Sequence, residues 1–155
     1  MESNSRTENN KNASGITTTR SPVDDRTAEV GGKDRAIRVL VVEDHRALRA
    51  SLAMFLEFHG YVVTASASFD EALQAAAATK PDVAVCDRHL NEDRDGIDVA
   101  RELQRQFGCR LVFVSGTAMD DLRAATKDLD VVAYISKPAL PDRIEAAVRK
   151  AKVAG

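Results

Sequence analysis

A short apolar run that ends in a carboxylate limits what this chain can fold into. Residues 83–87 have the sequence VAVCD, with Pro81 before them and a polar segment after them. In a chain that alternates such runs with helical patterns, this run is typical of a strand buried on both faces of a parallel sheet. Asp87 then lies at the carboxyl end of its strand, where open α/β sheets bind ligands. The sequence therefore predicts that Asp87 is a reactive group.

Strand and helix patterns alternate five times along the chain. β-Branched or apolar runs predict strands, and apolar residues that recur every three or four positions predict helices. The predicted strands span residues 37–42, 61–65, 81–87, 111–114 and 131–135, and the predicted helices span 45–59, 68–80, 97–107, 119–127 and 141–151. Joined by right-handed crossovers, these elements make a doubly wound α/β fold whose parallel strands all end at one edge.

Local signals mark some of the helix ends. Gly60 is the predicted C-cap of the first helix. Ser68 and Glu71 have the spacing of a capping box and open the second helix. The helix at 119–127 has few large apolar residues to bury, so we expect it to be the least firmly held.

Composition divides the chain into three parts. Residues 1–35 are mostly polar or charged and bury too little to offset their ordering entropy, which predicts a disordered arm. Residues 36–152 are predicted to form one globular domain, and residues 153–155 a short C-terminal tail. A domain of this size buries about two thirds of its unfolded surface, which is enough for independent folding.

Charge and composition exclude several kinds of partner. The formal net charge is -2 and the isoelectric point is near 5.9. This balance argues against nucleic acid and anionic membranes as ligands. The sequence also has neither a signal peptide nor an apolar stretch long enough to span a bilayer, so we expect a cytoplasmic protein. Cys86 and Cys109 belong to no metal-binding motif and are predicted to be free thiols in a reducing compartment.

Polar side chains follow four of the predicted strands, at the edge where the strands end. They are Glu43 and Asp44, then Asp87, then Ser115, then Lys137. Converging carboxylates repel each other, so at least one pKa should rise unless a cation is bound. Mg²⁺ suits a site with a few carboxylates, waters and a phosphate oxygen. A carboxylate nucleophile, Mg²⁺, a hydroxyl and a lysine are what phosphoryl transfer to an aspartate would use.

Each of these residues also has an ordinary structural explanation. Glu43 and Asp44 could simply be favourable acids in the first turn of a helix. Ser115 could be an N-cap, Asp87 a turn residue and Lys137 a solvated lysine. The functional prediction depends on all five occurring together at one edge of the sheet.

Four short motifs give the chain a resemblance to a known family. They are VVED at residues 41–44, Asp87 at the end of its strand, VSG at 114–116, and YISKP at 134–138. In this order and spacing they resemble the receiver domain of the response regulators of bacterial two-component signalling. The resemblance covers residues 37–151 and implies a flavodoxin-like (βα)5 fold with strand order 2-1-3-4-5.

The resemblance also implies a role for each residue of the motifs. Asp87 would accept a phosphoryl group from a phosphohistidine, and Ser115 and Lys137 would bind that group. Mg²⁺ would be held by Glu43, Asp44, Asp87 and the backbone carbonyl of His89. Tyr134 would move inward with Ser115 as the switch, the Lys137-Pro138 bond would be cis, and His89 and Thr117 would tune the lifetime of the phosphoryl group.

The loop after Asp87 departs from the family pattern. The family usually carries Met-Pro three and four residues after the phosphoacceptor and a glycine eight residues after it. Leu90 and Asn91 occupy the first two positions here, and Gly96 comes nine residues after Asp87. The loop is therefore predicted to hold one extra residue, which changes its shape and the angle of the His89 carbonyl.

The sequence as a whole predicts a stand-alone, Mg²⁺-dependent phosphoacceptor rather than an enzyme with turnover. The partners would be a sensor histidine kinase or a histidine phosphotransfer protein, and a downstream protein reached by contact through the fourth helix, fifth strand and fifth helix or by onward phosphotransfer. Since the chain ends at Gly155, soon after the last helix, we expect no attached output module.

Two alternatives stay open. A degenerate receiver would act as a scaffold without phosphoryl chemistry. A phosphatase of the haloacid-dehalogenase type would need a second Asp where this chain has His89, and usually a cap domain.

Overall fold

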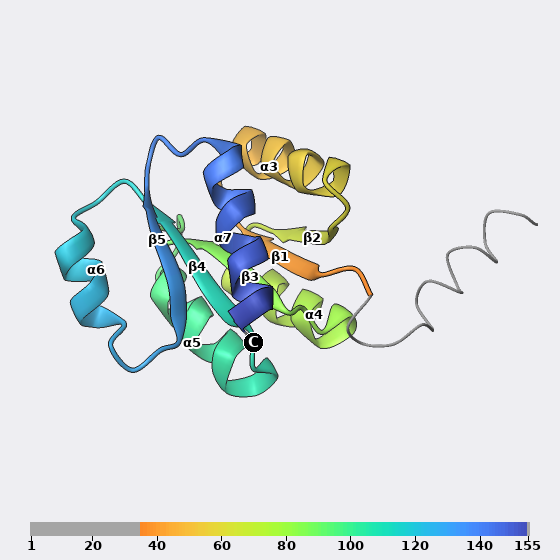
Figure 1. The fold of residues 1–155 in the computed structure, drawn as a ribbon. Helices are drawn as coiled ribbons and strands as arrows, with labels where there is room; N and C mark the ends of the chain where they lie inside the picture. Colours follow the sequence, from red (N-terminus) through yellow and green to blue (C-terminus); the bar gives the residue numbers. More distant parts are fainter. Residues whose placement is uncertain (1–34, 155) are drawn as a thin grey trace, which may run out of the picture. The chain divides into compact units, whose positions relative to one another are not determined.

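Five parallel strands form one sheet in the computed structural model, which describes residues 35–154 (Figure 1). The strands are β1 (Arg38–Val42), β2 (Val62–Ser66), β3 (Val83–Asp87), β4 (Arg110–Ser115) and β5 (Val131–Ser136). Their order is β2-β1-β3-β4-β5, and all four pairings are parallel. The predicted doubly wound, flavodoxin-like fold is confirmed. The predicted disordered arm, except for Arg35, lies outside the described residues.

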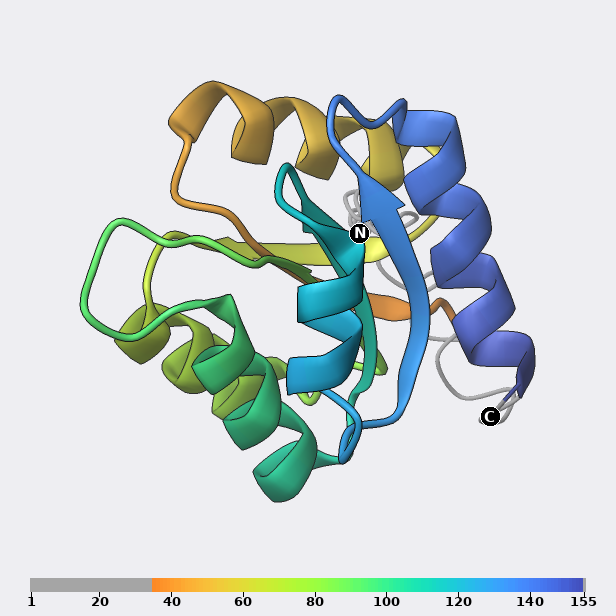
Figure 2. The ribbon, with the colours of Figure 1, turned by 90° about the vertical axis from the view of Figure 1, so that its left-hand side faces the viewer.

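Helices cover both faces of the sheet. They are α3 (Arg46–Phe58), α4 (Phe69–Thr79), α5 (Gly96–Phe107), α6 (Met119–Ala125) and α7 (Pro141–Ala154). Figure 2 shows α3 and α7 on one side of the sheet and α4 and α5 on the other. Among residues 35–154, none of these helices is both long and apolar enough to cross a bilayer.

Each face of the sheet has its own core. Leu40, Leu103 and Phe113 are fully buried on the side of α4 and α5, and Val39 and Leu56 are buried on the side of α3 and α7. Every residue of β3 is buried, as the uninterrupted apolar run predicts. Alternate residues of β3 therefore contribute to both cores, and this fixes the direction in which Asp87 leaves the strand.

The strand register brings the carboxyl ends of the strands together. Val42 of β1 pairs with Cys86 of β3, and Asp87 pairs with Val114 of β4. Ser115 at the end of β4 pairs with Ser136 at the end of β5. Since β1 lies between β2 and β3, the order of the strands reverses next to β3, and ligands bind at such a point in open α/β sheets.

The predicted cap signals are near the observed helix ends but differ in detail. The C-cap of α3 is His59, and Gly60 follows it with a φ of 93°, a left-handed value that favours glycine. At α4, the Ser68 hydroxyl accepts from the backbone N–H of Glu71 at 3.3 Å. The Glu71 carboxylate, however, accepts from the N–H of Ala67 at 2.8 Å and not from Ser68. The pair therefore caps the helix without the reciprocal bond of a capping box.

A complete capping box, which the sequence analysis did not predict, occurs at the start of α5. The Asp95 carboxylate accepts from the backbone N–H groups of Ile97 and Asp98. The Asp98 carboxylate accepts from the N–H of Asp95 at 3.0 Å. An aspartate pair in this role does not match the Ser/Thr-x-x-Glu/Gln pattern, so this motif does not reveal the capping box in the sequence.

The shortest described helix is α6, with seven residues. Its N-cap, Ala118, makes no side-chain hydrogen bond. Leu122 is fully buried in the core on the α4/α5 side and anchors the helix. The expectation that α6 is the least firmly held helix stays a prediction.

Both cysteines are buried and free. Burial raises the pKa of the Cys109 thiol to about 11, and burial also raises the pKa of Cys86. Since the thiolate is the reactive form, burial makes both thiols less reactive.

Candidate functional site

Asp87 is the last residue of β3 and lies almost wholly inside the protein, with an exposed fraction of 8%. Its Oδ2 atom is 3.0 Å from the Lys137 Nζ atom. Its Oδ1 atom accepts from the backbone N–H of His89 at 3.1 Å. The carboxylate is held from two sides and has a cation beside it.

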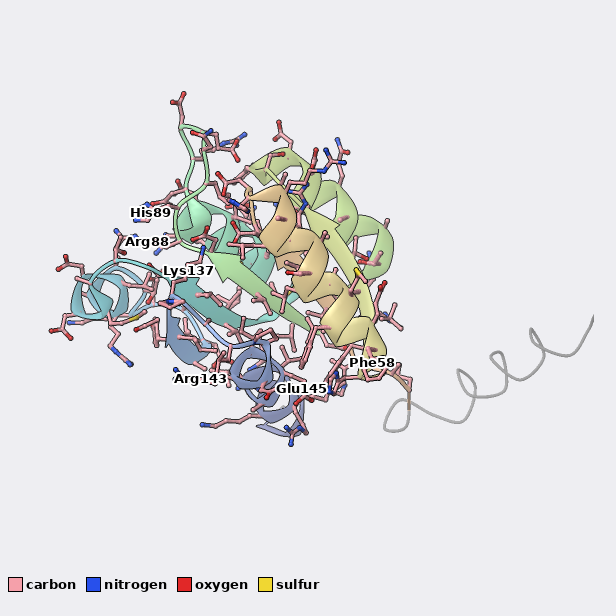
Figure 3. The ribbon with its side chains drawn as sticks, turned by 90° about the horizontal axis from the view of Figure 1, so that it is seen from above. Phe58, Arg88, His89, Lys137, Arg143 and Glu145 are labelled. Atoms are coloured by element: carbon pink, nitrogen blue, oxygen red, sulfur yellow. The ribbon has the colours of Figure 1, made fainter. Side chains whose placement is uncertain are left out.

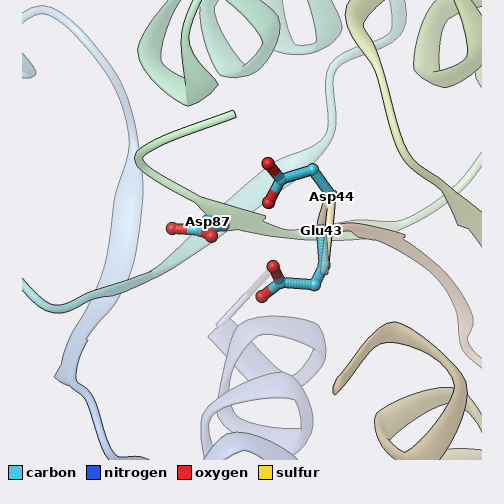
Figure 4. Close-up of side chains that lie close together, drawn as sticks. All are labelled: Glu43, Asp44 and Asp87. Atoms are coloured by element: carbon cyan, nitrogen blue, oxygen red, sulfur yellow. The ribbon is translucent and has the colours of Figure 1, made fainter. Parts of the chain in front are cut away.

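Two more carboxylates reach the same place from the end of β1. Glu43 is buried, with an exposed fraction of 8%, and Asp44 is half-buried. Glu43, Asp44 and Asp87 each have a carboxylate oxygen within 4.8 Å of the others (Figure 4). The three carboxylates therefore converge as predicted.

Lys137 joins two of the three acids. Its Nζ atom is 3.2 Å from Glu43 Oε1 as well as 3.0 Å from Asp87 Oδ2. Its backbone N–H donates to the carbonyl of Ser115 at 2.8 Å, which ties the end of β5 to the end of β4. The peptide bond between Lys137 and Pro138 is cis, as expected.

The electrostatics of the site follow from burial and from these contacts. Burial raises the pKa of Glu43 above its ordinary value, and the charge of Asp87 adds to this rise, although the His45 N–H and Lys137 oppose it. Burial lowers the pKa of Lys137, but contacts with Asp87 and Glu43 outweigh burial and raise it. Glu43 is thus the acid whose pKa rises, and burial is a larger cause of the rise than repulsion from Asp87. One lysine incompletely compensates three acids, and the site retains a surplus of negative charge.

Ser115 lies at the end of β4 and is fully buried. Its Oγ atom accepts from the backbone N–H of Thr117 at 3.1 Å and lies 2.9 Å from the Thr117 hydroxyl. Within residues 35–154, the Ser115 hydroxyl therefore bonds Thr117 and none of the three acids or Lys137. Sequence reasoning predicted that Ser115 and Thr117 both belong to the site, but not that they bond each other.

Tyr134 on β5 is held by residues at the end of α6. Its hydroxyl is 2.6 Å from the Thr126 Oγ1 atom, and the Thr126 hydroxyl also donates to the Leu122 carbonyl. The guanidinium of Arg123 lies over the Tyr134 ring, 4.4 Å from its centre. The ring stacks on Phe113 at 6.1 Å. Sequence reasoning missed Thr126, because nothing in its local pattern indicates a partner on the next strand.

The loop after Asp87 is anchored by close contacts at both ends. The backbone N–H of Gly96 donates to the carbonyl of Arg88 at 2.7 Å. A Cβ atom added to Gly96 would lie 1.8 Å from the carbonyl oxygen of Asp87, so the two segments touch backbone to backbone. His89 is exposed, and Figure 3 shows it beside Arg88 on the side of the molecule where Lys137 lies.

The middle of this loop docks on the start of α4. The Glu92 carboxylate accepts from the backbone N–H of Phe69 at 2.8 Å. Arg94 lies 3.5 Å above the Phe69 ring centre and 3.2 Å from the Asp70 carboxylate. Residues 91–94 are nevertheless exposed, so the run is a surface loop that makes a few contacts with α4. The contacting residues are more than 20 positions apart in the chain, so the local sequence gives no sign of these contacts.

A mostly apolar cavity of about 450 Å³ opens beside the acids, between α3 and α7. Its walls include Leu48, Leu52, Val85, Val114, Pro138 and Ile144, and Glu43, Asp87 and Lys137 also line it. The acids therefore stand between a low-dielectric wall and the surface, which is consistent with the effect of burial on Glu43.

Known proteins share these features. A family model described as "Response regulator receiver domain" matches residues 39–149. Response regulator MprA of Mycobacterium ulcerans is 37% identical over 124 residues, which are 76% of this chain and 53% of that protein. MprA of Mycobacterium tuberculosis is 37% identical over 116 residues, covering 74% and 50%. The chain spans about half the length of these curated relatives.

Solved structures agree with this result. A response regulator receiver domain protein from Methanospirillum hungatei has a TM-score of 0.67 at 26% identity, covering 77% of this chain and 99% of that one. The signal receiver domain of a modulated diguanylate cyclase from Desulfovibrio desulfuricans has a TM-score of 0.66 at 29% identity, again covering 77% and 99%.

Proposed function

The chain belongs to the response regulator receiver domains of two-component signalling, and from this premise we propose that Asp87 accepts a phosphoryl group with the help of Mg²⁺. One observation carries the proposal: the buried Asp87 carboxylate lies 3.0 Å from the Lys137 ammonium and beside Glu43 and Asp44. A nucleophile, a cation for the phosphoryl oxygens and a set of hard ligands for a metal are thus in one place.

The residues present fit a bound Mg²⁺. Carboxylate oxygens of Glu43, Asp44 and Asp87 lie within 4.8 Å of one another, and hard divalent cations prefer such oxygen donors. The raised pKa of Glu43 reflects a buried acid whose charge Lys137 does not fully compensate. We propose these three side chains and the His89 backbone carbonyl as the protein's ligands. The bound ion would neutralise charge on the phosphoryl oxygens.

The chain's own residues would perform the transfer as follows. An oxygen of Asp87 forms a bond to phosphorus while the bond from phosphorus to the donor histidine nitrogen breaks. The Lys137 ammonium stabilises the negative charge on the phosphoryl oxygens. The Ser115 hydroxyl gives up its hydrogen bond with the Thr117 hydroxyl and binds a phosphoryl oxygen instead. His89 and Thr117 flank the group and set its lifetime.

The output would follow from Ser115 and Tyr134. When Ser115 turns to the phosphoryl group, the Tyr134 ring moves inward and its bond to Thr126 is lost. The surface of α6, β5 and α7 then changes its affinity for a downstream protein. The donor would be a sensor histidine kinase or a histidine phosphotransfer protein. The expectations of a cytoplasmic location and of action without an attached output module stay predictions.

No observation favours either rival function. The phosphatase alternative needs a second acid where His89 stands, and His89 is exposed. The altered loop is the argument for the scaffold alternative. The three acids nevertheless have carboxylate oxygens within 4.8 Å of one another, and Lys137 lies 3.2 Å from Glu43 and 3.0 Å from Asp87.

Incubation with acetyl phosphate tests the proposed function. In the presence of Mg²⁺, intact-mass spectrometry should show an added mass of about 80 Da, the mass of one phosphoryl group. Removing the metal with EDTA should abolish the adduct, because the metal supplies charge that Lys137 alone does not. An adduct that forms equally well in EDTA would contradict the metal's role. If no adduct forms, repeating the assay with phosphorylated histidine phosphotransfer protein as donor decides between a receiver and a scaffold.

Replacing Glu43 with Gln should separate metal binding from stability. We expect Mg²⁺ to bind at least about tenfold more weakly, a loss of about 1.4 kcal/mol, because one ligand charge is removed. The free energy of unfolding should stay the same or rise, because the buried charge of Glu43 is costly without metal. Calorimetric Mg²⁺ titration and urea unfolding measure the two effects. The matched control is Glu57→Gln, an exposed position on α3; equal loss of Mg²⁺ affinity in both variants would contradict the assignment.

A further inference from the structure

The outward face of α3 is apolar along most of its length, whereas the exposed face of a surface helix is ordinarily polar. Met54 and Phe58 have exposed fractions of 69% and 87%. Ala47 and Ala50 are exposed beside them, while Leu56 on the opposite face packs in the core. Figure 3 shows α3 at the surface, with Phe58 at its end. No described residue covers this stripe of apolar side chains.

Two opposite charges border the stripe. Arg46 begins α3 and Glu57 is its penultimate residue. Eleven residues are close to three helical turns, so the two side chains lie on the same side of α3, about 16 Å apart. Both residues are exposed, and neither side chain makes a hydrogen bond or ion pair with any residue between 35 and 154.

We propose that the outward face of α3 pairs, antiparallel, with α3 of a second copy of this chain. A two-fold axis through the middle of the contact places Arg46 opposite Glu57 of the second copy, and it repeats the same pair at the other end. The antiparallel arrangement also brings each helix N-terminus near the partner's C-terminus, which their dipoles favour. The charge pattern is therefore complementary to itself.

The register set by the charges also fits the shapes of the side chains. With Arg46 opposite Glu57, Met54 falls at the level of Arg49 in the second copy. The Arg49 side chain turns away from the contact and donates to the carbonyls of Glu43 and Asp44. The surface at that level consists of Ala47, Ala50 and Ser51, and a methionine packs well over such small side chains. Each copy thus offers one large side chain and one shallow site.

The second copy is a better occupant than an unrelated helix for one reason. In a two-fold pair, Arg46 and Glu57 each meet the opposite charge of the other copy, whereas an unrelated partner would have to supply both matching charges itself. None of the residues involved belongs to the phosphoryl site, so this proposal and the proposed function stand or fall separately.

Sedimentation equilibrium of the full chain tests the pairing. The parent should dimerise with a dissociation constant of roughly 10 to 500 µM, since one helix pair is a small interface. Arg46→Glu and Glu57→Arg should each weaken the dimer at least about tenfold, because like charges then face each other. The double variant Arg46→Glu/Glu57→Arg restores opposite charges and should return to within about threefold of the parent.

The net charge provides an internal control. Arg46→Glu changes the formal net charge from -2 to -4, and Glu57→Arg changes it from -2 to 0. If general repulsion between copies controlled association, the two variants would shift it in opposite directions. Specific pairing of Arg46 with Glu57 instead predicts that both variants weaken association. All changes are at exposed positions, and circular dichroism confirms that each variant is folded.

Three results would overturn the proposal. A parent chain that stays monomeric up to about 1 mM would show that α3 does not self-associate and that its face serves another protein. A double variant that dimerises no more tightly than the single variants would show that Arg46 and Glu57 do not pair across the contact. A dimer unaffected by Met54→Lys would place the contact on another surface.

Discussion

The Asp87→Asn variant should take up no phosphoryl group from acetyl phosphate and Mg²⁺, a loss of at least about 100-fold in rate, while its fold stays intact. An amide does not replace a carboxylate as nucleophile. The single oxygen of Asn can still accept from the His89 N–H, as Oδ1 of the parent carboxylate does at 3.1 Å, and Lys137 keeps its contact with Glu43 at 3.2 Å. Intact-mass spectrometry measures the uptake, and thermal unfolding should show a change of only a few degrees. The variant isolates the chemistry of Asp87 from its structural role.

The matched control for this variant is Asp93→Asn. Asp93 is an exposed carboxylate in the same loop and should keep the parent's uptake. The parent's adduct should also be lost on treatment with hydroxylamine, which cleaves acyl phosphates. Uptake that survives Asp87→Asn, or that disappears in Asp93→Asn, would show that another group is the acceptor and would contradict the proposed function.

The second large effect is expected at Gly96, where an added methyl group has no space. In Gly96→Ala the Cβ atom would lie 1.8 Å from the Asp87 carbonyl oxygen and 2.9 Å from the Arg88 Cα atom. Both neighbours are backbone and cannot rotate away, so β3 and α5 must move apart. We expect a loss of about 3 kcal/mol in the free energy of unfolding, seen as a fall of about 10 °C or more in Tm.

The control for Gly96 is Gly116, at the end of β4. A Cβ atom added to Gly116 would have its nearest neighbour, Lys137 Cβ, at 3.9 Å, which is ordinary contact. Gly116→Ala should therefore change the free energy of unfolding by less than about 1 kcal/mol. Urea unfolding measures both variants. Equal stability of the two alanine variants would contradict the close approach of α5 to the end of β3.

The same contact closes the loop that follows Asp87. The glycine comes nine residues after Asp87 instead of the family's eight, yet it still touches the Asp87 backbone. The extra residue that the family pattern predicts stays a prediction, and it would lie between Arg88 and Asp95. Glu92 bonds the start of α4 there, and Leu90 is buried. These contacts hold the middle of the loop on the α4 side of the sheet.

Local sequence patterns are enough to predict the strands, their order along the chain and the residues at their ends. An uninterrupted apolar run such as β3 must be buried on both faces, and a polar residue after it must leave the sheet at its edge. Parallel strands end at one edge, so Glu43, Asp44, Asp87 and Lys137 had to converge. These inferences need only local patterns and one topological rule.

The hydrogen bonds between side chains at that edge could not be predicted without the folded structure. Ser115 bonds Thr117, Tyr134 bonds Thr126, and Glu92 caps a helix 23 residues before it. Such contacts depend on rotamers and on the packing of segments far apart in the chain, and no periodicity records them. The site's composition follows from the order of the strands, and its present hydrogen bonds follow from how the loops close over it.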